Sequence, residues 1–146
     1  MNGKERVNLS KVIEKMNLVN LTPDIDVKGI WIHVPEFNRP ALQLTGFYDQ
    51  FDNDRIQIIG NVEYSYLKSL SETERYERYM QLLSSNIPCL IFCRNLEPEA
   101  EIIELAKKYQ IPILKSEEST SSFSAEVIRW LKVPVSYTHL TLPTIL

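Results

Sequence analysis

The sequence predicts an α/β fold, a small parallel-type sheet with helices on both of its faces. Three observations favour this class. Residues 88–93 are apolar on both alternating faces, which is typical of an interior strand covered on both sides in a parallel sheet. A second short apolar run follows at residues 111–114. Amphipathic helical patterns alternate with these runs, and the order strand, helix, strand, helix is typical of parallel sheets with right-handed crossovers.

The segment before residue 71 extends this pattern less regularly. Residues 11–17 predict a short helix, residues 29–33 a strand, and residues 55–59 another strand that ends at Gly60. Residues 35–54 are rich in turn-forming residues and predict a loop. A helix is expected after Gly60, on apolar residues at helical spacing: Val62, Tyr66, Leu67 and Leu70.

Each helix after residue 71 has a start signal. Ser71 and Glu74 form the S-x-x-E pattern of a capping box. Pro98 stands at a first-turn position among glutamates, which suit the positive end of a helix dipole. Either Ser119 or Thr120 caps the last helix. The side chains expected to face inward are Tyr76, Tyr79, Met80 and Leu83 in the first helix, Ile102, Ile103, Leu105, Ala106 and Tyr109 in the second, and Phe123, Val127, Trp130 and Leu131 in the third.

Composition and charge bound the function. The chain has 146 residues, 44% of them apolar and 24% charged, which suits one globular domain. A net charge of -3 without a basic cluster argues against a nucleic-acid partner. The apolar runs are too short to cross a membrane, and the first residues lack the apolar stretch of a secretory signal. We therefore expect a cytoplasmic protein.

The two cysteines are expected to be buried thiols. Cys89 and Cys93 lie four residues apart in a predicted strand, so their Cα atoms are about 13 Å apart. A disulfide needs Cα atoms within about 7 Å, so the two cannot pair there. A metal site would need two further ligands, and only His33 and His139 could supply imidazoles. Neither a disulfide nor a metal site is therefore predicted.

Residues 133–146 differ in kind from the rest, because they contain no Asp, Glu, Lys or Arg. Residues 135–144 also match, codon for codon, a transposase adapter used in sequencing libraries when that adapter is translated in frame. We expect residues 1–132 to form the domain and residues 133–146 to be a non-native tail. The alternative is a natural extended tail.

The sequence offers no recognisable catalytic constellation. None of its four glycines, Gly3, Gly29, Gly46 and Gly60, lies in a phosphate-binding loop pattern. A catalytic triad would have to use His33, which is expected to be a structural or surface residue. No catalytic residue, cofactor or metal ligand is therefore predicted.

Two segments are candidates for contact with a ligand or a subunit. Asn38 and Arg39 precede a proline, which holds the arginine in a stiff loop where it could bind a carboxylate or phosphate. The alternative is a structural loop pinned to the edge of the sheet. Ser119 and Thr120 join a strand to the start of a helix, where anions often dock. Simple helix capping explains the same two residues.

Several motifs together resemble the N-terminal domain of HPr kinase/phosphorylase. Residues 38–48, NRPALQLTGFY, resemble the family pattern N-R-P-G-L-x-L-x-G-[FY]. Blocks at residues 55–67, 87–98 and 111–120 follow in the family's order and spacing. The similarity covers about residues 7–132. Ala41 replaces the usual glycine, which would strain the loop by about 1 kcal/mol if that position had a positive φ.

The resemblance implies a fold similar to the first domain of Mur ligases. It also implies that the full-length protein is an ATP- and Mg²⁺-dependent, hexameric enzyme of the phosphotransferase system and of carbon catabolite repression. Such an enzyme phosphorylates a serine of HPr and removes that phosphate by phosphorolysis. Its catalytic residues lie in a C-terminal kinase domain, expected shortly after Leu131, so none is carried over to this chain. We therefore expect a regulatory or assembly domain; the alternative is a stand-alone ligand-sensing or interaction domain.

Overall fold

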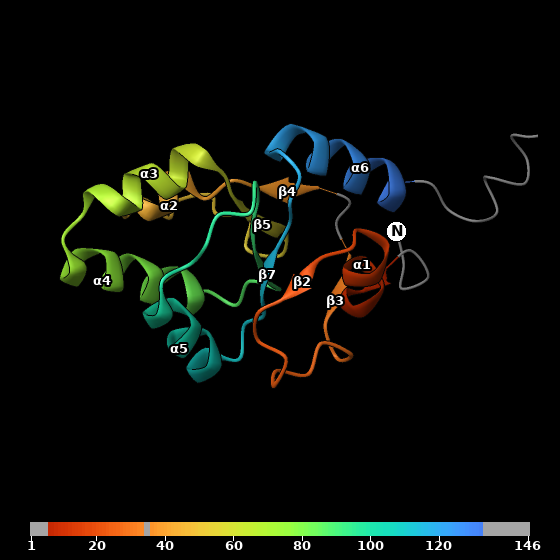
Figure 1. Cartoon of the computed structure of the whole chain (residues 1–146), viewed down its shortest axis with the longest axis horizontal. Helices are drawn as coiled ribbons and strands as arrows, with labels where there is room; N and C mark the ends of the chain where they lie inside the picture. Colours follow the sequence, from red (N-terminus) through yellow and green to blue (C-terminus); the bar gives the residue numbers. More distant parts are fainter. Residues whose placement is uncertain (1–5, 34–35, 133–146) are drawn as a thin grey trace, which may run out of the picture.

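A computed structural model describes residues 6–33 and 36–132 of the chain (Figure 1). The expectations for residues 133–146, including His139, lie outside the described residues. The strands are β1 (Val7–Asn8), β2 (Val19–Asn20), β3 (Trp31–Ile32), β4 (Phe37–Asn38), β5 (Ile56–Ile59), β6 (Leu90–Phe92) and β7 (Ile113–Lys115). The helices are α1 (Leu9–Lys15), α2 (Ala41–Leu44), α3 (Asn61–Ser69), α4 (Glu72–Leu83), α5 (Ala100–Tyr109) and α6 (Thr120–Lys132).

The main sheet has five strands in the order β2-β7-β6-β5-β4. Strands β4 to β7 run parallel, with Ile58 beside Ile91 and Ile91 beside Leu114, and β2 adds an antiparallel edge next to β7. The predicted α/β class with a parallel-type sheet is therefore confirmed. The strand expected at residues 29–33 is shorter and does not extend this sheet. It is β3, which pairs with β1 in a separate antiparallel ribbon.

Helices cover both faces of the main sheet (Figure 1). One core cluster joins the sheet to α2, α3, α4 and α5, and the other joins it to α1 and α6. Strand β6 serves both clusters, since Leu90 and Phe92 belong to the first and Ile91 to the second. This double burial is the physical reason for the run of apolar residues without alternation.

The helix starts follow the sequence signals with one exception. The Ser71 Oγ accepts a hydrogen bond from the Glu74 amide at 3.2 Å, which confirms the capping box. The Ser119 Oγ likewise accepts from the Ser122 amide at 3.2 Å, so Ser119 caps α6. The prediction that Pro98 lies in the first turn was wrong, because Glu99 is the N-cap of α5 and the helix begins at Ala100.

The prediction that Tyr76 faces inward was also wrong. Tyr76 is 41% exposed, whereas Tyr79, Leu82 and Leu83 of the same helix are buried. Tyr79, Leu82 and Leu83 belong to the core cluster that joins α4 to α5, and Tyr76 lies outside that cluster. Phe123 and Val127 face the core as expected. The side chains of Trp130 and Leu131 lie outside the described part of the structure.

The two cysteines are free and buried, as expected. Burial raises the pKa of Cys89 to about 12 and that of Cys93 to about 11. We expect neither thiol to react with a disulfide reagent at pH 8 in the folded protein, and both to react after unfolding in urea. Rapid stoichiometric labelling of the folded protein would contradict the buried positions.

The same shifts predict a fall in stability in alkali. In the unfolded chain each thiol ionises near pH 9, its ordinary value, while the folded protein keeps both protons to higher pH. The stabilising contribution is therefore complete below pH 9 and is lost as the pH rises toward 12. Urea midpoints measured at pH 8 and pH 10 should differ by less in a Cys89→Ala variant than in the parent chain.

Candidate functional site

A pocket of about 520 Å³ lies at the carboxyl ends of the parallel strands, and we call it the edge pocket. Its polar lining comes from Arg39, which follows β4, from Arg94, which follows β6, and from Thr120 at the start of α6. The carboxyl ends of parallel strands meet at one edge of a sheet, which is where ligands of open α/β sheets bind. The fold thus gathers residues from three distant parts of the chain at this edge.

The remaining lining is of two kinds. Polar groups come from α3 and α6, and apolar side chains come from β4, α3 and α6. The polar residues are Asn61, Ser121 and Ser124, and the apolar residues are Phe37, Val62 and Ile128. The edge pocket therefore offers cationic and hydroxyl groups beside an apolar surface.

Arg39 is tied to the start of α3. Its Nη2 donates to the Glu63 Oε1 at 2.8 Å, and the Glu63 side chain is only 3% exposed. The same oxygen accepts a hydrogen bond from the Gly60 amide at 2.8 Å, which caps the helix. The Arg39 side chain itself stays 39% exposed, and a guanidinium carries five N–H donors. Arg39 is therefore anchored through one nitrogen while it keeps donors toward the pocket.

Gly60 permits this arrangement because it has no side chain. A Cβ at this position would lie 2.5 Å from the Thr120 Oγ1 and 2.7 Å from the Arg39 Nη2. Both separations are shorter than real Cβ contacts, so at least the short threonine side chain would have to move. The glycine that ends β5 thus lets Arg39 and Thr120 approach each other.

Arg94 has an unusual backbone conformation. Its φ is 58° and that of Asn95 is 55°, so two consecutive non-glycine residues are left-handed. Backbone hydrogen bonds hold the turn, from the Arg94 amide to the Glu118 carbonyl and from the Asn95 amide to the Ser116 carbonyl, both at 2.8 Å. The Arg94 side chain is exposed, and no carboxylate of residues 6–33 and 36–132 lies within salt-bridge distance of it.

The structure separates the four candidate residues into two pairs. Arg39 and Thr120 line the edge pocket, and Ser119 only caps α6. Asn38 does not line the edge pocket. Its Nδ2 donates to the Gln57 Oε1 at 2.7 Å and to the Gln43 Oε1 at 3.3 Å. Ala41 begins α2 without a positive φ, so the expected strain is absent from this loop.

Sequence reasoning missed Arg94 as a site residue. The available signal was an arginine directly after a strand that is buried on both faces, which places it at the carboxyl edge of a parallel sheet.

His33 is exposed, as expected for a surface histidine. The described residues contain no group of three or more His, Cys, Asp or Glu that could hold a metal ion. No helix in the same residues is long and apolar enough to cross a membrane.

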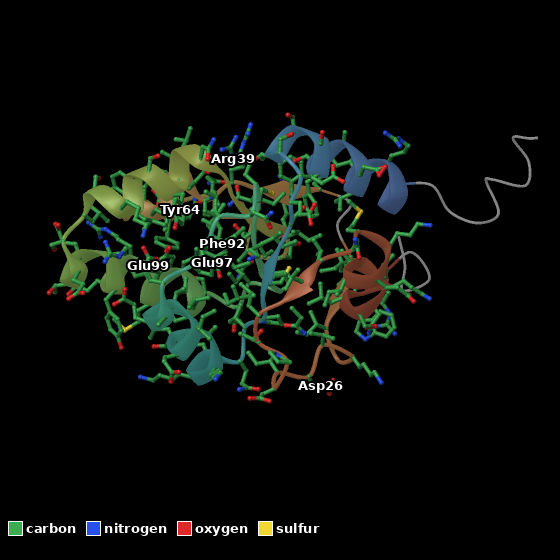
Figure 2. The ribbon with its side chains drawn as sticks, viewed as in Figure 1. Asp26, Arg39, Tyr64, Phe92, Glu97 and Glu99 are labelled. Carbon is green, nitrogen blue, oxygen red and sulfur yellow. The ribbon has the colours of Figure 1, made fainter. Side chains whose placement is uncertain are left out.

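A second polar cluster lies away from Arg39 and serves the fold (Figure 2). Glu99 is 14% exposed and lies 3.1 Å from the Lys68 Nζ, and its Oε1 accepts from the Tyr79 hydroxyl at 3.3 Å. Burial and the neighbouring Glu99 carboxylate raise the pKa of Tyr79 far above its ordinary value, so the phenol stays a donor. These contacts join α3 and α4 to the start of α5, which gives the cluster a structural role.

Comparison with known proteins assigns the family. Residues 7–131 match the family described as HPr Serine kinase N terminus. HPr kinase/phosphorylase of Lachnoclostridium phytofermentans is 50% identical over 130 residues, covering 89% of this chain and 42% of that protein. HPr kinase/phosphorylase of Caldicellulosiruptor bescii is 39% identical over 123 residues, covering 84% of this chain and 40% of that protein. The chain therefore spans about 40% of the length of these relatives.

A solved structure shares the fold. It comprises the CBS and DRTGG domains of the regulatory region of Clostridium perfringens pyrophosphatase, complexed with the activator diadenosine tetraphosphate. The TM-score is 0.54 at 15% sequence identity, over 94% of this chain and 60% of the other. At that identity the likeness concerns the fold alone, whereas the family match and the 50% identity concern the sequence. The chain belongs to the HPr kinase/phosphorylase family, as its N-terminal domain.

Proposed function

We propose that this domain is the regulatory and assembly part of a longer, bifunctional HPr kinase/phosphorylase. The observation that carries the proposal is the 50% identity to the Lachnoclostridium phytofermentans enzyme over 42% of that protein. In this proposal a C-terminal kinase domain uses ATP and Mg²⁺ to phosphorylate a serine of HPr and also removes the phosphate. The full protein works in the cytoplasm as a homo-oligomer, a hexamer by resemblance, and controls the use of carbon sources.

The sequence supports a regulatory role for this domain and a catalytic role for the C-terminal domain. Phosphoryl transfer depends on positioning and on charge stabilisation around the phosphates, which P-loop enzymes achieve with a G-x-x-x-x-G-K-[ST] loop. The 146 residues contain no such pattern. The edge pocket contains arginines and hydroxyls, and its lining includes no carboxylate or histidine that could act as a general base. The proposal therefore assigns the transfer chemistry to residues outside this sequence.

A kinase assay tests the proposal at the protein level. Purified chain mixed with ATP, Mg²⁺ and HPr is expected to leave HPr unmodified, because the phosphate cradle is missing. A protein extended along its natural gene beyond residue 132 is expected to phosphorylate HPr under the same conditions. Stoichiometric phosphoserine produced by the 146-residue chain would contradict the proposal, and so would a gene without a P-loop pattern after this domain.

A stand-alone ligand-sensing domain is the second candidate. The exposed Arg94, which has no carboxylate partner among the described residues, favours a binding role of this kind. The two candidates differ in what the gene encodes after residue 132. A stop codon or an unrelated domain there favours the stand-alone sensor, and a P-loop domain favours the enzyme.

A further inference from the structure

We infer that the edge pocket binds a small phosphate ester. The phosphate lies between the guanidinium groups of Arg39 and Arg94, and the organic part lies on the apolar side formed by Phe37, Val62 and Ile128. This inference does not depend on the proposed function, since it concerns only residues of this chain.

The charges in the edge pocket select an anion. Arg39 and Arg94 both line it, and no acidic side chain belongs to its lining. Glu63 balances Arg39 through the 2.8 Å salt bridge, which leaves the charge of Arg94 unbalanced within the described residues. A guanidinium presents its donors as a planar fork that matches phosphate oxygens, and it is always charged. The pocket therefore favours an anion over a cation or a neutral sugar.

Hydroxyl groups complete the polar side of the pocket. Thr120 and Ser121 lie at the start of α6, a helix of 13 residues, and both line the cavity. Their side chains can donate to phosphate oxygens, and the partial positive charge of the helix start adds to the field of the arginines. Ser119 is not counted among these donors, because it does not line the pocket and its Oγ accepts the capping hydrogen bond from the Ser122 amide.

The backbone at Arg94 indicates that the position of this side chain matters. Left-handed conformations are unfavourable for an arginine and persist where the surrounding structure enforces them. Here the two hydrogen bonds to the Ser116 and Glu118 carbonyls enforce the turn. Glycine would occupy the same turn without strain, so the arginine is present at this position at the expense of stability.

Size and apolar lining indicate an ester rather than inorganic phosphate. A pocket of about 520 Å³ falls within the range of small-molecule sites and is larger than a single phosphate ion needs. Val62 is exposed, and Phe37 and Ile128 are half-buried, so an organic group of modest size would cover apolar surface that otherwise contacts water. The phosphate would then contact the polar lining residues, and the organic group would contact the apolar ones.

Nuclear magnetic resonance titration with phenyl phosphate tests the inference. We expect saturable shifts of the amide signals of Arg39, Arg94 and Thr120 in the 146-residue chain. Arg94→Gln should weaken binding by about tenfold or more, since it removes a charge-assisted fork. Arg129→Gln is the matched control, because it removes the same charge from an exposed position of α6. Arg129 pairs with Glu126, and neither residue lines the edge pocket. An equal loss in both variants, or no saturable shifts, would overturn the site.

Two further measurements complete the test. The first distinguishes a phosphate ester from inorganic phosphate, and the second distinguishes a loss of binding from a loss of folding. Phenyl phosphate should bind about tenfold more tightly than inorganic phosphate, and phenol should not bind measurably; equal affinity of the ester and the ion would overturn the ester assignment. Arg94→Gly should lose binding while its urea midpoint stays the same or rises, because glycine relieves the left-handed strain. A lower midpoint together with the loss of binding would show that Arg94 is structural.

Discussion

Phe92→Ala is expected to lower the free energy of unfolding by about 3–5 kcal/mol. Phe92 is fully buried in β6, the strand that serves both core clusters. Its ring meets Tyr64 edge to face, with centroids 6.4 Å apart and planes at 90°, and Figure 2 labels the two side chains. Removal of the ring leaves a cavity that α3 and α5 cannot fill without moving. Urea unfolding followed by circular dichroism measures the change.

The matched control is Phe47→Ala. Phe47 is 50% exposed, so the same chemical change should alter stability by no more than about 0.5 kcal/mol. Tyr64 also donates its hydroxyl to the Glu97 carbonyl at 2.6 Å, which ties α3 to the segment after β6. If the two phenylalanine variants unfolded at the same urea concentration, the placement of β6 at the centre of the sheet would be wrong.

Glu63→Ala is expected to be the second most damaging change, at about 2–4 kcal/mol. Its Oε1 accepts from both the Gly60 amide and the Arg39 Nη2, each at 2.8 Å. Alanine would leave the amide without its acceptor in a buried place and would free the guanidinium from its anchor. Denaturant midpoints of the parent and variant chains give the difference.

Two variants isolate the causes of this effect. Glu63→Gln keeps an acceptor for the Gly60 amide and removes only the charge, so we expect roughly half of the destabilisation. Glu104→Ala removes an exposed carboxylate from α5 and should change stability by less than about 0.5 kcal/mol. Equal midpoints for Glu63→Ala and Glu104→Ala would contradict the anchoring role of Glu63.

The strong elements of the fold could be predicted from the sequence because their signals are physical requirements. A strand buried on both faces, such as β6, needs consecutive apolar residues, and α4 carries its own capping box at Ser71. Strands β1, β2 and β4 have two residues each, which is too short for any periodicity. Only the tertiary pairing of these segments makes them strands, so sequence reasoning could not find them.

The site could be predicted only in part for a similar reason. Arg39 was a candidate because the proline after it restricts the loop, and Thr120 because it stands at a helix start. Their proximity depends on the space that Gly60 leaves between β5 and α6. Arg94 depends on a left-handed turn held by carbonyls more than twenty residues away, and no local pattern announces such a turn.

A crystal structure of the chain with phenyl phosphate tests the edge pocket most directly. We expect phosphate oxygens within hydrogen-bond distance, about 3 Å, of the guanidinium groups of Arg39 and Arg94, with the phenyl ring against Phe37. The salt bridge between Arg39 and Glu63 should remain, because it uses only one guanidinium nitrogen. An edge pocket that stays empty at saturating ligand, or an ester bound elsewhere on the surface, would contradict the assignment.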